Sequence, residues 1–112
     1  MKNVWITTQF VGFHSYPDAP KEVEFLKNKH RHTFFCKVEI EVNHNDRDIE
    51  FFIFRNYINN IIKKLINKNN AGSCEMIAEI IVEQCTKDYP ARKITVIISE
   101  DNENGATVTN YD

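Results

Sequence analysis

Glycine and proline are scarce in this chain, with three residues of each among 112. A flexible linker or a low-complexity tail would be rich in such residues, so neither is expected. No apolar run is long enough to cross a membrane, and the N-terminus lacks the apolar segment of a signal peptide. We therefore expect a single domain over residues 1–112, located in the cytosol and with no membrane partner.

An excess of charge of one sign is also missing, because 14 basic residues stand against 16 acidic ones and the formal net charge is −2. The chain thus lacks the basic surface of a general nucleic-acid binder, and DNA is not an expected partner. Cysteines are few, and Cys36, Cys74 and Cys85 show no Cys-x-x-Cys spacing. We interpret Cys36 and Cys85 as small buried side chains. Catalysis by Cys74 is not expected, because no histidine is near it in the sequence.

Periodicity predicts the order of the elements. Alternating residues predict strands over 3–13, 33–42, 94–101 and 106–111, with 47–54 as a further strand that pairs with 33–42. Helical spacing predicts two helices between them. Their expected buried stripes are Ile58, Ile61, Ile62, Leu65 and Ile66 in the first, and Met76, Ile77, Ile80, Ile81 and Cys85 in the second.

Turn and capping residues set the boundaries of these elements. Asn69-Asn70-Ala71-Gly72 ends the first helix, Ser73 is a suitable N-cap for the second, and Tyr89-Pro90 closes it. Segment 14–29 is a long connection with at most one helical turn over 21–26, and long ordered loops in small domains are usually functional. The expected fold is therefore α+β, with an antiparallel sheet in ββααββ order and two helices packed on one face.

Histidines form the most distinctive pattern. His14 follows the first strand, while His30 and His32 precede residues 33–42 at a spacing that puts both side chains on one face of a strand. A third histidine from a neighbouring strand could complete a three-nitrogen zinc site. Alternatively, His30 and His32 are a polar strand entrance and His14 is a loop residue. Zinc therefore stays an open alternative, and no metal ligand, cofactor or catalytic residue is assigned.

Other groups suited to a ligand lie at the ends of elements. Glu100 ends a strand and could accept paired N–H groups from a purine-like or pterin-like ring, unless it belongs to a solvated turn. Residues 73–75 open a helix whose N-terminus could seat a phosphate, although capping alone explains Ser73. Aromatic and basic side chains could stack on a base or bind phosphates, although packing or solvation explains each one singly. They are Phe10, Phe13, Tyr16 and Phe35, and Arg31, Arg47 and Arg55.

The ββααββ order, together with His14, His30 and His32, resembles the tunnelling-fold pterin enzymes, the pyruvoyl- and carboxy-tetrahydropterin synthases. This resemblance implies zinc on the three histidines and a pterin anchored by Glu100. The family's catalytic cysteine would fall within residues 25–28, which read Phe-Leu-Lys-Asn, and its Asp-His relay within 66–69, which read Ile-Asn-Lys-Asn. Arg31 replaces a small residue between the histidines and changes the charge there. Turnover of a pterin is therefore not expected.

A closer resemblance is to a phage family, the first type of Thoeris anti-defence proteins. It rests on residues 12–20, 28–32, 46–52, 73–79 and 99–105, and would cover nearly the whole chain. The resemblance implies a sponge that sequesters a cyclic nucleotide signal made by TIR enzymes, glycocyclic ADP-ribose, without degrading it. It also implies a symmetric homo-oligomer in the bacterial host cytosol, with cyclic oligonucleotides as a further ligand class.

We accordingly predict a non-enzymatic, oligomeric nucleotide-binding protein that blocks Thoeris immunity. The alternatives are a zinc-dependent enzyme similar to the pterin synthases, a non-catalytic ligand-binding relative of them, and a structural or protein-interaction module of the same fold. The expected ligand-binding residues are Phe13, His14, Tyr16, Arg31, Arg47, Arg55, Glu75, Glu100 and Asn104.

Overall fold

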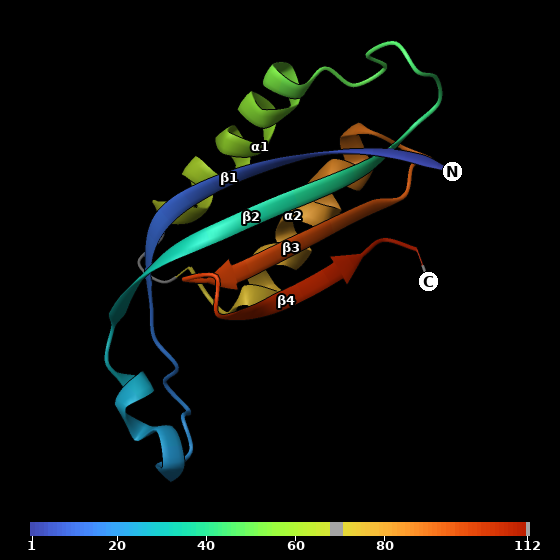
Figure 1. Cartoon of the computed structure of the whole chain (residues 1–112). Coiled ribbons are helices and arrows are strands. Elements are labelled where there is room, and N and C mark those ends of the chain that lie inside the picture. Colours follow the sequence, from blue (N-terminus) through green and yellow to red (C-terminus); the bar gives the residue numbers. More distant parts are fainter. Residues whose placement is uncertain (68–70, 112) are drawn as a thin grey trace.

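The computed structural model describes residues 1–67 and 71–111. Within them, four antiparallel strands form one sheet in the order β1-β2-β3-β4. Two helices cover one face of this sheet (Figure 1). The bounds of these elements are β1 Lys2–His14, β2 His30–Val42, α1 Phe51–Ile66, α2 Cys74–Asp88, β3 Ile94–Glu100 and β4 Asn104–Thr109. The predicted α+β class with an antiparallel sheet is confirmed.

The core lies between the sheet and the helices. Along β2, Phe34, Cys36, Val38 and Ile40 are buried against the helices, as alternation predicts. The helix α1 contributes residues at helical spacing from its inner side, and they are Phe54, Ile58, Ile61, Ile62 and Leu65. These residues join one apolar cluster, so the sheet end that carries the histidines rests on a packed support.

The strand predicted over residues 47–54 is wrong. Arg47 has a positive φ of 57°, and α1 begins at Phe51. The side chain of Glu50 caps this helix by accepting hydrogen bonds from the backbone N–H groups of Phe52 and Ile53. The apolar run 51–54 is therefore the first turn of a helix whose periodicity continues to Leu65, and only its composition resembles a strand.

The second helix begins where predicted, because the Ser73 hydroxyl accepts a hydrogen bond from the Met76 N–H. Its buried stripe is shifted by one position from the predicted one, since Met76 and Ile80 are 61% and 37% exposed. The buried residues are Cys74, Ile77, Ala78, Ile81, Val82 and Cys85. This phase turns the small Cys74 and Ala78 inward and brings the start of α2 into the core.

The turn between β3 and β4 is shorter than the sequence predicts. Asp101 and Asn102 take the left-handed conformation, with φ of 54° and 60°, so that β4 starts at Asn104, opposite Glu100. A Cβ at position 105 would lie 2.0 Å from the Ile98 carbonyl oxygen, which explains the glycine there. Asn69 and Asn70, part of the predicted turn after α1, lie outside the described residues.

The connection between β1 and β2 extends beyond the helices as an arm, which we define as residues 15–29 (Figure 1). A 3₁₀ helix, η1 Lys21–Lys27, occupies much of it, close to the predicted helical turn. Backbone hydrogen bonds close the arm, because the Tyr16 N–H donates to the Leu26 carbonyl oxygen over 2.7 Å. The histidines lie where this arm joins the sheet.

Candidate metal and ligand site

The register of β1 and β2 brings three histidines together. His14 lies directly opposite His30, and His32 follows two residues later on the same face of β2. One potential ligand atom from each of the three residues lies within 4.8 Å of the others. His14 is 8% exposed, whereas His30 and His32 are half-buried. The spacing argument for a three-histidine cluster is confirmed as geometry.

Each of these imidazole rings is held by its Nδ1 atom. The Nδ1–H of His14 donates to the Gly72 carbonyl oxygen, and that of His30 to the Asn28 carbonyl oxygen, both over 2.8 Å. Nδ1 of His32 lies 2.8 Å from a carboxylate oxygen of Asp101. Because a carbonyl oxygen only accepts, Nδ1 of His14 and Nδ1 of His30 each carry a hydrogen. Rings oriented in this way are typical of metal-binding histidines.

Phe34 forms the apolar floor of the cluster. Its ring centroid lies 5.4 Å from that of His14 and 5.9 Å from that of His32, with the rings nearly perpendicular. Phe10 stacks on Phe34 at 5.1 Å. This floor fixes the tilt of two imidazoles and keeps water from their inner side, which strengthens electrostatic interactions at the cluster.

Glu100 is the acidic neighbour of the histidines. One carboxylate oxygen lies 2.9 Å from Nε2 of His14 and 3.4 Å from Nε2 of His32. The other accepts a hydrogen bond from the Asn104 amide over 3.1 Å. An Nε2 that donates to Glu100 cannot bind a metal at the same time. Metal binding would therefore release one carboxylate oxygen for the N–H groups of a ligand.

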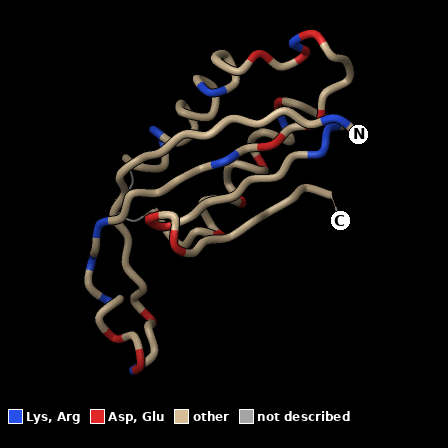
Figure 2. Tube along the Cα trace, viewed as in Figure 1, with Lys and Arg blue, Asp and Glu red and all other residues tan. Residues whose placement is uncertain are grey.

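Acidic residues surround the cluster on the β3–β4 turn and at the start of α2. The turn carries Glu100, Asp101 and Glu103, and Figure 2 shows acidic segments there. Hydrogen bonds from His32 and from the Thr33 N–H hold the pKa of the Asp101 carboxyl below its ordinary value. Carboxylates that stay ionised next to imidazole nitrogens favour a divalent cation.

All three cysteines are buried, which confirms the interpretation of Cys36 and Cys85. Burial raises the pKa of both thiols to about 12. Cys74 is nearest to the site, and burial together with the carboxylates of Glu100 and Glu75 raises its pKa to about 11. These thiols stay protonated near neutral pH, so none of them offers the thiolate needed by a nucleophile.

The predicted site residues separate into groups. His14, Glu100 and Asn104 meet at the cluster, and Glu75 lies at the adjoining start of α2. Phe13 and Arg31 pair with each other across β1 and β2, on the opposite face of the sheet from the histidines. The charge of Arg31 is therefore not directed between His30 and His32.

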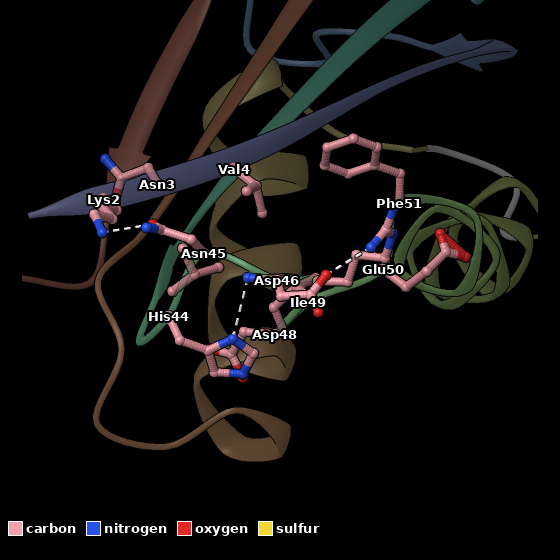
Figure 3. A pocket seen from close by; sticks show the side chains of 12 residues that line it. Lys2, Asn3, Val4, His44, Asn45, Asp46, Asp48, Ile49, Glu50 and Phe51 are labelled. Atoms are coloured by element: carbon pink, nitrogen blue, oxygen red, sulfur yellow. Dashed lines mark hydrogen bonds and ion pairs between the residues drawn. The ribbon is translucent and has the colours of Figure 1, made fainter.

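The remaining three predicted residues lie apart from the cluster. Tyr16 is in the arm and is half-exposed, and the Arg55 guanidinium donates to the Thr7 carbonyl oxygen over 3.2 Å. Arg47 lines a hollow of about 520 Å³ next to Lys2, at the other end of the sheet (Figure 3). Arg47 pairs with Asp46 there, and Asp48 pairs with Arg92, so we assign no ligand to this hollow.

Asp101 and two backbone carbonyls are the site groups that sequence reasoning missed. The sequence could have predicted a role for Asp101, because it follows Glu100 directly and strand ends often present carboxylates to a ligand. The carbonyl oxygens of Asn28 and Gly72 carry no such signal, since every residue has one. Only the folded chain brings them next to an imidazole.

No protein-family model matches this chain, and no curated protein sequence matches it at a significant level. Among the described residues, neither helix is long and apolar enough to span a membrane.

Proposed function

We propose that this chain binds Zn²⁺ through His14, His30 and His32 and binds a small heterocyclic ligand beside it, without turning the ligand over. The observation that carries the proposal is the anchoring of all three imidazoles by Nδ1, together with potential ligand atoms of the three residues that lie within 4.8 Å of one another. Three nitrogen donors with an open fourth position are typical of zinc sites that receive a small molecule. This arrangement favours the zinc alternative that the sequence left open.

The chain's own groups suit a ring with N–H donors. When bound, zinc would act as a Lewis acid toward an oxygen or nitrogen atom of the ligand. The carboxylate of Glu100 would accept N–H groups of a pterin-like or purine-like ring, and Asn104 would hold that carboxylate in place. Phe34 would exclude water from the inner side of the site.

Binding without turnover is supported by the state of the thiols. The pterin synthases use a cysteine thiolate, whereas all three cysteines here are buried with raised pKa values. The segment before His30 that would hold the family's cysteine reads Phe25-Leu26-Lys27-Asn28. A protein with affinity and no nucleophile would retain its ligand.

Sequestration of glycocyclic ADP-ribose, the Thoeris signal, is the narrower form of this proposal and rests on the resemblance. The adenine ring suits Glu100, but a pyrophosphate needs cationic partners. Arg31, Arg47 and Arg55 lie apart within one copy of the chain. We therefore propose that a second copy of the chain supplies arginines to this ligand, within the symmetric oligomer that the resemblance implies. The resemblance also implies a cytosolic location.

Thermal unfolding with stoichiometric Zn²⁺, followed by a ligand panel, tests the proposal. The panel contains a pterin, a guanine nucleoside, glycocyclic ADP-ribose and a cyclic dinucleotide. A ligand at 100 times its Kd should stabilise the protein by roughly 2.7 kcal/mol. Denaturing the complex and analysing the released molecule by mass spectrometry then separates two outcomes. Intact ligand supports sequestration, and altered ligand would establish the enzyme alternative.

Two further results of this experiment matter. A protein that takes up no zinc would overturn the proposed function. Light scattering on the same samples gives the mass of the particle and tests the predicted homo-oligomer.

A further inference from the structure

We propose that Asp101 is a positioning residue of the metal site, which holds His32 in place through a charged hydrogen bond. This inference rests on the proposed function, because it concerns the strength of the same zinc site. His32 differs from the other two histidines in the group that its Nδ1 atom meets. A carboxylate stands there, whereas His14 and His30 donate to neutral carbonyl oxygens.

The contacts of Asp101 use both of its carboxylate oxygens. One oxygen accepts from Nδ1 of His32 over 2.8 Å, and the other accepts from the Thr33 N–H over 3.1 Å. The backbone N–H of Asp101 donates to the Thr33 carbonyl oxygen over 2.8 Å. The residue is thus bound to β2 at three points, directly beside the histidine that it orients.

The backbone of Asp101 directs its side chain toward β2. Its φ of 54° lies in the left-handed region, which aspartate and asparagine tolerate better than most residues. An unusual conformation of this kind at a ligand site is retained where the surroundings fix it, as the contacts with Thr33 do here. The turn between β3 and β4 is therefore part of the metal site.

An anionic acceptor at Nδ1 strengthens Nε2 as a metal ligand more than a neutral carbonyl oxygen does, since it stabilises the positive charge that an imidazole gains on metal binding. His32 should accordingly be the strongest of the three donors. Loss of an outer partner of this kind typically lowers metal affinity ~10–100-fold.

The test compares Asp101→Asn with Glu103→Gln. Both variants remove one negative charge from the same turn, and asparagine tolerates the left-handed backbone. Zinc affinity is measured by competition with a chromophoric chelator, and the visible absorption of the Co²⁺-loaded protein reports the ligand field. We expect Asp101→Asn to weaken zinc binding ~10–100-fold and to alter the Co²⁺ spectrum. Glu103→Gln should leave both unchanged.

A second variant separates positioning from folding. Asp101→Gly removes the carboxylate and still favours a positive φ, so the metal-free protein should unfold near the wild-type temperature while zinc binding weakens. Zinc affinity and a Co²⁺ spectrum like those of the wild type, in either Asp101 variant, would overturn the inference alone. A wild-type protein that binds no zinc would instead overturn the proposed function.

Discussion

The two ends of the β1–β2 pair differ in which ionisable side chains they bring together. At the end where Lys2 faces Val42, charges of opposite sign bind each other. Asp48 accepts a hydrogen bond from Arg92 over 2.7 Å, and Asp46 pairs with Arg47. At the end where His14 faces His30, three imidazoles gather around one another, with Glu100 as the shared acidic neighbour of two of them.

The difference separates charges that neutralise each other within the chain from a cluster of side chains with the geometry to bind a metal ion as well. A carboxylate held by a guanidinium has its hydrogen-bonding capacity used within the chain, and adding a ligand gains little. At the other end, three histidines bring potential ligand atoms within 4.8 Å of one another, with Glu100 close to two of them. This concentration of metal-binding groups exceeds what a packed fold requires and departs from local consistency. Such departures are expected at functional sites.

The largest expected effect comes from removing one histidine of the cluster. His30→Ala should weaken zinc binding by more than the ~10–100-fold that losing an outer partner costs, because it deletes a ligand itself. His44→Ala is the matched control, since His44 is the remaining histidine and lies beside Asp48 at the other end of the sheet. Chelator competition on both variants gives the comparison. Equal zinc affinity in the two variants would show that zinc binding does not distinguish the two ends of the sheet.

A smaller effect is expected from the apolar floor. Phe34 and Phe54 are both almost fully buried, and replacing either with alanine should cost ~3–5 kcal/mol of unfolding free energy. Only Phe34 contacts the imidazoles of His14 and His32, so only Phe34→Ala should also weaken zinc binding beyond what the loss of stability explains. Urea unfolding and zinc titration of both variants at low temperature measure the two effects. Equal zinc affinity in the two folded variants would show that the floor does not orient the rings.

The sequence predicts most of the fold because its periodicities are long. The alternation in residues 33–42 and the helical spacing from Ile58 to Leu65 each repeat several times, so one ambiguous residue changes little. The strand prediction for residues 47–54 is wrong for the opposite reason. Their apolar run is short, and only the capping by Glu50 assigns it to a helix.

The candidate site was predictable only in part. Spacing alone indicates that His30 and His32 share a face, and the register of two neighbouring strands then brings in His14. The same alternation places Arg31 on the opposite face of the sheet from His30 and His32, although its charge had suggested that it belongs to the site. The positions of Arg47 and Arg55 depend on where α1 starts, so the error over residues 47–54 carried over to them.

The smallest expected effect depends on pH and concerns the end of the sheet where Lys2 faces Val42. The hydrogen bond from Arg92 lowers the pKa of Asp48 from 3.8 to about 2, helped by the Asn43 N–H. A carboxyl whose pKa is lower in the folded state stabilises the protein above its unfolded pKa, and that contribution is lost as the pH falls through the folded pKa. Asp48→Asn should therefore be less stable than the wild type at pH 7, and the two should converge between pH 4 and pH 2.

Asp46→Asn is the control for this pH dependence. Asp46 and Arg47 are 83% and 79% exposed, and an exposed ion pair adds little to stability at any pH. Thermal unfolding of the wild type and both variants across this range gives the comparison. A gap between wild type and Asp48→Asn that persists at pH 2 would mean that Asp48 acts by its shape and hydrogen bonds rather than its charge. The end of the sheet near Lys2 would then be held by packing rather than by its ion pairs, and its contrast with the histidine end would no longer be one of charge.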